Sequence, residues 1–168
     1  MTDYTITEFY LSKQGLTELP TDLLLYTNLQ KLWCDNNQLT ELPELPASLQ
    51  KLWCFNNQLT ELPLLPASLQ ELYCHVNQLT KLPLLPASLQ KLWCTSNQLT
   101  ELPELPASLK ELECINNQLT ELPELPASLK KLWCYKNLID VNFPIIPKNI
   151  PRYNKWLVER RMQNPEFK

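Results

Sequence analysis

Glycine and histidine are almost missing from this chain, which has one of each, Gly15 and His75, among 168 residues. Phosphate-binding loops need several glycines, because their backbone adopts positive φ angles and approaches the ligand closely. A single histidine excludes metal sites built from several imidazoles and leaves one candidate for histidine-dependent catalysis. The composition therefore argues against a nucleotide-binding enzyme and against a histidine-rich metalloprotein.

The chain also lacks an excess of positive charge and any long apolar segment. Its net charge of −3 argues against a nucleic-acid partner, since phosphate backbones attract basic surfaces. No apolar run reaches the ~20 residues that a membrane-spanning helix needs. The first residues, MTDYTITEFY, carry neither the basic nor the apolar region of a secretion signal. These features predict a cytoplasmic protein with no membrane partner.

What the sequence does contain is a repeat of 20 residues. Cysteines recur at this spacing, and an asparagine follows each of them after three residues: Cys34, Cys54, Cys74, Cys94, Cys114 and Cys134, with Asn37, Asn57, Asn77, Asn97, Asn117 and Asn137. A divergent earlier unit fits the same frame, with Leu11 at the cysteine position and Leu16 lying 23 residues before Leu39. Such a period predicts a solenoid, in which each unit forms one coil and stacks on the next.

Each unit predicts one short strand and one extended return segment. Leu32-Trp33-Cys34 alternates with the period of a strand, with leucine and cysteine pointing inward. Pro43 and Pro46 exclude a helix interior and a central strand from the return segment and favour a polyproline-like path. We therefore predict a β-dominated α/β repeat solenoid with a parallel concave sheet and an irregular convex side.

The C-terminal residues predict a different structure. The segment PRYNKWLVERRMQ is typical of a helix, and Pro151 is tolerated in its first turn. Tyr153, Trp156 and Leu157 would cover the last coil, because the ends of a solenoid need a cap. We predict a solenoid over residues 1–147 and a helical cap over residues 148–168.

The unit L-x-x-L-W-C-x-x-N-Q-L resembles the leucine-rich repeat, L-x-x-L-x-L-x-x-N-x-L, over roughly residues 6–150. The return segment L-P-x-L-P-x-S-L is similar to that of bacterial effectors of the YopM and IpaH type, without a ubiquitin-ligase domain. The resemblance implies a right-handed coil that binds a host protein. It also implies the host-cell cytosol as the location of an effector-like protein.

The six cysteines have three possible interpretations: a buried packing ladder, a disulfide framework or a soft-metal site. In-register neighbours on parallel strands do not readily supply the dihedral angle of a disulfide. No Cys-x-x-Cys pair fits zinc. We predict a packing ladder, with no metal and no cofactor. The asparagines are predicted to pair with backbone groups at the end of each strand.

Cys74 and His75 are adjacent and resemble a nucleophile with its base. Consecutive side chains of a strand point to opposite faces, so the thiol is predicted in the core and the imidazole outside. The repeated glutamates lie on a solvated stripe without a pocket. No catalytic constellation is assembled, and we predict that the protein is not an enzyme.

Two outward columns on the concave side form the predicted binding surface. One is mostly aromatic, and the other, directly after each cysteine, holds six different residues in six repeats whose glutamines and serines are nearly uniform. We interpret this contrast as diversification toward a partner protein. The predicted partner-binding residues are Trp33, Trp53, Phe55, Tyr73, His75, Val76, Trp93, Thr95, Glu113, Ile115, Trp133 and Tyr135, with Lys51 and Lys91 beside them for cation–π contacts.

Two other functions fit the same columns. A row of tryptophans can stack on sugars or on single-stranded bases, although the net charge disfavours the bases. The other alternative is a structural protein, monomeric or weakly self-associating through the edge strand around Ile6–Leu11. Leu64 and Leu84, which stand where other repeats have glutamate, form a smaller second patch on the return side.

Overall fold

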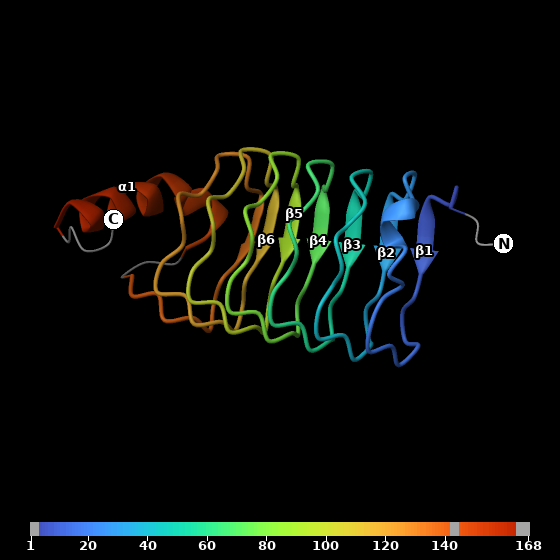
Figure 1. The fold of residues 1–168 in the computed structure, drawn as a ribbon. Helices are drawn as coiled ribbons and strands as arrows, with labels where there is room; N and C mark the ends of the chain where they lie inside the picture. The colour runs from blue at the N-terminus through green and yellow to red at the C-terminus, as the bar shows by residue number, and fades with distance from the viewer. Residues whose placement is uncertain (1–3, 142–144, 164–168) are drawn as a thin grey trace.

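The structure is a computed structural model and describes residues 4–141 and 145–163. Its coils stack side by side along one axis, with the strands on one side and a helix at the C-terminal end (Figure 1). The return segments 41–46, 61–66, 81–86, 101–106 and 121–126 contain neither helix nor strand, as their prolines predict. The predicted β-dominated solenoid is confirmed. Residues 1–3 and 142–144 of the predicted solenoid, and residues 164–168 of the predicted cap, lie outside the described residues.

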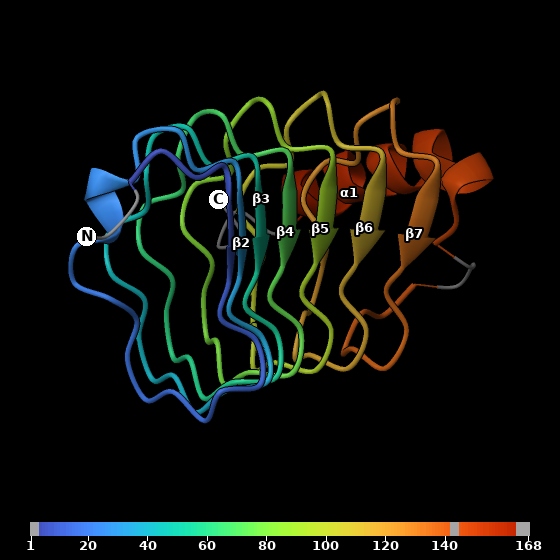
Figure 2. The same cartoon turned by 90° about the vertical axis from the view of Figure 1, so that its right-hand side faces the viewer.

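Seven strands of the described residues form one parallel sheet in the order of the sequence. They are β1 (Glu8–Tyr10), β2 (Lys31–Trp33), β3 (Lys51–Trp53), β4 (Glu71–Tyr73), β5 (Lys91–Trp93), β6 (Glu111–Glu113) and β7 (Lys131–Trp133). The repeat sets the register, because each residue of β2 to β6 pairs with the residue 20 positions later, as Lys31 does with Lys51. Figure 2 views the strands side by side, and we call the outer surface of this sheet the concave face.

Leucine and cysteine fill the inside of the coils. The central leucine of each inner strand, such as Leu72, is completely buried, and so is the cysteine that follows it, such as Cys74. All six thiols are free, and only Cys134, in the last coil, is partly exposed. Free cysteine packs as a small apolar side chain. The predicted packing ladder is therefore confirmed.

Each asparagine of the ladder connects two consecutive coils. The Asn77 Nδ2 donates to the carbonyl oxygens of Cys54 and Cys74, both at 3.1 Å, and its Oδ1 accepts from the Leu59 N–H at 3.0 Å. The same three bonds recur at Asn57, Asn97, Asn117 and Asn137. Buried backbone groups at the strand ends are thus paired, as we predicted.

A left-handed residue stands two positions after each cysteine and, in the first unit, two positions after Leu11. The φ angle lies between 51° and 58° at Lys13, Asn36, Asn56, Val76, Ser96, Asn116 and Lys136. Asparagine tolerates this conformation, whereas a β-branched side chain is strained in it. We did not predict this turn from the sequence, although asparagine at three of the seven positions is a usable signal for it. Val76 is therefore a strained residue on the concave face.

The first coil is longer than the others and contains a short 3-10 helix, η1 (Leu23–Leu25). Leu23 and Tyr26 are buried there, and the Tyr26 ring packs against Phe9 of β1 with a centroid distance of 5.0 Å. The additional residues of the 23-residue step thus place apolar side chains over the first coil. The longer step is visible in the sequence, but we did not predict the helix from it.

The last coil is covered by helix α1 (Ile150–Gln163), which follows the 3-10 helix η2 (Pro147–Asn149). The buried Tyr153 hydroxyl donates to the Leu122 carbonyl at 2.6 Å and accepts from the Leu122 N–H at 2.7 Å. The Asn154 side chain makes the same two bonds with the Leu125 backbone, each at 2.9 Å. In the described part of the chain, no helix has the length and apolar character needed to cross a membrane.

Candidate partner-binding face

Aromatic rings form a continuous column on the concave face. The rings of Tyr10, Trp33, Trp53 and Tyr73 are parallel to within 8°, and their successive centroids are 4.3, 4.5 and 5.4 Å apart. Trp93 instead meets Tyr73 edge to face, at 4.9 Å and 83°. Within the stacked run, each ring covers the face of its neighbour. The column therefore presents ring edges, rather than ring faces, to solvent.

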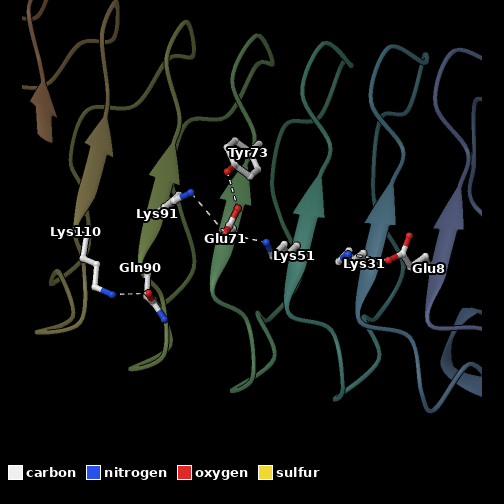
Figure 3. A network of polar contacts seen from close by, with 8 residues as sticks. All are labelled: Glu8, Lys31, Lys51, Glu71, Tyr73, Gln90, Lys91 and Lys110. Atoms are coloured by element: carbon white, nitrogen blue, oxygen red, sulfur yellow. Dashed lines mark hydrogen bonds and ion pairs between the residues drawn. The ribbon is translucent and has the colours of Figure 1, made fainter.

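Exposure differs along this column. Tyr10, at its first end, is 61% exposed, whereas Tyr73 is only 9% exposed; Trp133, which Glu113 separates from the column, is 39% exposed. Our prediction of an exposed ring at position 73 is therefore wrong. The ring lies between Trp53 and Trp93, and its hydroxyl donates to the Glu71 Oε2 at 2.6 Å (Figure 3). Tyr73 supports its neighbours from within the column.

Lysines beside the column form ion pairs with glutamates. The Glu71 Oε1 lies 3.0 Å from the Lys51 Nζ and 3.7 Å from the Lys91 Nζ (Figure 3). We predicted cation–π contacts for these two lysines, and the structure places them around this carboxylate instead. Burial pushes the Glu71 pKa upward, but the Tyr73 hydrogen bond and the two lysines outweigh it and hold the pKa below its ordinary value. A cation–π contact is made by Lys31, whose Nζ is 6.0 Å from the centre of the Trp33 ring.

The second column, after the cysteines, continues the aromatic surface at its centre. The Phe55 and His75 rings stack with centroids 4.4 Å apart and planes 8° apart, and His75 leans toward Trp93 at 6.3 Å. Further along, the Thr95 hydroxyl donates to the Glu113 Oε1 at 3.0 Å. The two predicted columns are thus in direct contact at the middle of the face.

The remaining predicted residues lie at the margin of this surface. Ile115 is half-buried, Val76 is 45% exposed and Tyr135 is 59% exposed. Asp35, which we placed in the outward column, is buried instead. Its carboxylate accepts bonds from the Ser12 hydroxyl and the Asn36 side chain, both at 2.6 Å.

Two polar atoms at the centre of the face are buried and unpaired. Among the described residues, the His75 Nδ1 and the Trp93 Nε1 have no hydrogen-bond partner. A buried polar atom left without a partner costs about 1–3 kcal/mol. Burial also lowers the pKa of His75, so its imidazole is neutral at pH 7. The two side chains with this energetic cost, His75 and Trp93, are both among the predicted partner-binding residues.

The thiols have no catalytic neighbour on this face. Burial raises the pKa of Cys74 to about 12 and that of Cys134 to about 11, so neither forms a thiolate at neutral pH. Cys74 is in the core, whereas the adjacent His75 ring lies outside on Phe55. Within residues 4–141 and 145–163, no cluster of three or more histidine, cysteine or acidic side chains could hold a metal ion.

Comparison with protein families identifies the repeat. The family described as "Leucine Rich repeats (2 copies)" matches residues 47–87 and 67–107, and "Leucine Rich Repeat" matches residues 28–49. The inward leucines, the asparagine ladder and the parallel sheet agree with both matches. These units are leucine-rich repeats. Proteins with such repeats generally act as non-catalytic interaction scaffolds.

Several solved leucine-rich-repeat structures from bacteria are similar to this chain. YopM from Yersinia enterocolitica WA-314 is 40% identical over 83% of this chain and 31% of its own, with a TM-score of 0.77. A Shigella effector domain is 38% identical over 83% of this chain and 62% of its own, with a TM-score of 0.76. InlJ from Listeria monocytogenes, whose functional domain includes a cysteine ladder, is 32% identical over 82% of this chain and 32% of its own, with a TM-score of 0.72.

The chain thus spans from 31% to 62% of the length of these three structures. A search of curated proteins finds no match. The solved structures support the effector-like character of the repeat unit and its cysteine ladder. They supply no partner for this particular concave face.

Proposed function

We propose that this chain is a non-catalytic binding module that holds a partner protein or peptide on its concave face. The observation that carries the proposal is the centre of that face, where His75 and Trp93 each bury a polar atom without a partner among the described residues. Such unpaired groups are rare in folded proteins and need an explanation. A partner that reorients either ring on binding would pair these atoms and recover part of their cost.

The aromatic column suits a protein partner. Tryptophan and tyrosine are enriched among the residues that dominate binding energy at protein interfaces. Ring edges carry partial positive charge, so the edges presented by Trp33 and Trp53 attract carbonyl oxygens, carboxylates and the faces of other rings. All three groups are common on protein surfaces.

The same geometry disfavours the glycan alternative. A sugar or a base stacks on the open face of a ring. From Tyr10 to Tyr73 the ring faces are covered by neighbouring rings, which leaves mainly the outer face of the exposed Tyr10. The stacked run therefore favours an edge-on protein contact over a flat ligand.

The partner is sought in host-cell lysate, because a similar structure is a Shigella effector domain. The baits are the wild-type chain, a Trp53→Ala/Trp93→Ala variant, and a Leu64→Ala/Leu84→Ala control that truncates two exposed leucines of the return side. We expect the wild type and the control to hold the same protein and the tryptophan variant to lose it. Circular dichroism and thermal melting verify that all three baits fold.

A second variant separates binding from column stability. Ile115→Lys changes a half-buried position of the variable column without removing an aromatic ring. We expect it to weaken the binding of the captured partner by about tenfold or more, because a charge is left unpaired in the interface. Retention of the partner by both the tryptophan variant and Ile115→Lys would contradict the proposal.

A further inference from the structure

The sheet has two open edges within the described residues, at β1 and β7. In each inner coil the N–H of the cysteine donates to the strand that follows, as Cys54 does to the Tyr73 carbonyl at 2.9 Å and Cys114 to the Trp133 carbonyl at 2.8 Å. Cys134 follows β7, and the described residues place no strand beyond it. An open strand edge presents unpaired backbone groups that can accept another strand.

The β7 edge adjoins an apolar hollow of about 510 Å³, lined by Trp133, Tyr135, Ile139, Ile145 and Ile146 among others. The Tyr153 and Asn154 side chains of helix α1 bond the return segment, at Leu122 and Leu125. Two aromatic side chains of its lining are exposed, Trp133 at 39% and Tyr135 at 59%. Among the described residues, no further strand covers the strand side of the last coil.

An inner part of the chain shows what would complete this edge. Strand β4 reads Glu-Leu-Tyr and lies between β3 and β5, which both read Lys-Leu-Trp. The Glu71 carboxylate lies between Lys51 and Lys91, and it also accepts the Tyr73 hydroxyl (Figure 3). The Tyr73 ring contacts a tryptophan on each side.

Strand β1 reproduces β4 with one neighbour missing. It reads Glu-Phe-Tyr, the Tyr10 hydroxyl donates to the Glu8 carboxylate, and Glu8 pairs with Lys31 of β2 at 2.7 Å. Tyr10 stacks on Trp33 on one side, and the ring is 61% exposed. The neighbour that β4 has, and that β1 lacks among the described residues, is a preceding Lys-Leu-Trp strand. Strand β7 has that sequence and an open edge of the required direction.

We propose that β7 of one copy pairs in parallel with β1 of a second copy, with Lys131 opposite Glu8, Leu132 opposite Phe9 and Trp133 opposite Tyr10. The pairing repeats the register of β3 with β4. It places Glu8 between two lysines, extends the aromatic column across the junction and supplies the Cys134 N–H with the Tyr10 carbonyl. Because the two surfaces differ, the contact is head to tail, and it builds short linear assemblies unless a ring closes.

Sedimentation velocity of the 168-residue chain from about 10 µM to about 500 µM tests the proposal, because association follows mass action. We expect the weight-average sedimentation coefficient of the wild type to rise with concentration. Glu8→Lys and Lys131→Glu each place like charges opposite one another across the junction, and each should weaken association by about tenfold or more. Glu44→Lys, an exposed charge reversal on the return side, is the matched control and should associate like the wild type.

An equimolar mixture of the Glu8→Lys and Lys131→Glu chains provides the decisive measurement. Opposite charges face each other again in both mixed junctions, so the mixture should associate where each variant alone does not. A wild type that stays monomeric at the highest concentration would overturn the proposal. The β7 edge would then be a binding site for a strand of another protein. Association that is equal in all variants would place the contact elsewhere and would also overturn it. Trp53→Ala/Trp93→Ala leaves both edges intact, so this result is independent of the proposed concave-face function.

Discussion

The side-chain amide of Asn97 donates to the carbonyl oxygen of Cys74, one coil earlier, at 3.1 Å. The same side chain also bonds the Cys94 carbonyl and the Leu79 N–H, so one buried residue serves three backbone groups. Asn97→Ala leaves these groups unpaired, and we expect the free energy of unfolding to fall by about 3 kcal/mol. Urea denaturation measures this change. The exposed neighbour Gln98, replaced by alanine, should change stability by less than about 0.5 kcal/mol, and equal losses would contradict the prediction.

The strained turn at Val76 predicts a stabilising substitution. Its φ angle is 54°, a conformation that costs an ordinary L-residue about 1–2 kcal/mol and asparagine less. Val76→Asn should therefore raise the free energy of unfolding by about 1 kcal/mol. The reverse change at an equivalent exposed position, Asn116→Val, should lower it by a similar amount. Thermal melting of the two variants and the wild type measures these changes. The prediction is wrong if both variants shift the melting temperature in the same direction.

The cysteine ladder predicts a loss of stability at alkaline pH. Burial raises the pKa of Cys74 from its ordinary value of 9.0 to about 12, so the folded thiol stays protonated where the unfolded thiol ionises. The stability that the buried, protonated Cys74 thiol contributes to the folded state is fully present below pH 9 and is lost as pH rises through 12. Urea midpoints between about pH 7 and about pH 11 measure this slope. A Cys74→Ala/Cys94→Ala variant should have a shallower slope, and an unchanged slope would assign the loss to other groups.

The cap helix depends on one phenol group. The Tyr153 hydroxyl pairs with both the N–H and the carbonyl of Leu122, and Tyr153→Phe leaves these two buried backbone groups unpaired. We expect a loss of about 1–3 kcal/mol, accompanied by faster hydrogen exchange at Leu122. Tyr135→Phe changes an exposed ring of the last coil and should leave both quantities unchanged. Unaltered exchange at Leu122 in Tyr153→Phe would contradict this role.

The repeat spacing made most of the fold predictable. Once Leu32-Trp33-Cys34 is a strand, stacking of equal units dictates that Lys31 pairs with Lys51 and that the cysteines form a ladder. The asparagine ladder followed from the need to pair buried backbone groups. The cap was predictable from a change in pattern, and Tyr153 and Leu157 are buried as expected.

The candidate site was predictable as a set of positions but not in its geometry. Strand alternation assigns Tyr73 to a face, whereas its side-chain torsions, and hence its burial, depend on the rings around it. Asp35 was misplaced for a related reason, because its burial depends on Ser12, which is 23 residues away in the longer first unit. The unpaired atoms of His75 and Trp93 arise from packing and have no counterpart in the residue pattern.

The asparagine bonds have a consequence for how this molecule can change in size. Asn77 reaches the coil that precedes it and no other, and every later asparagine does the same. Loss or duplication of one inner unit therefore leaves the asparagine bonds between the remaining coils unchanged, because each new neighbour offers the same backbone groups. The length of the concave face is thus a variable that recombination can adjust one coil at a time, while the core needs no compensating substitution.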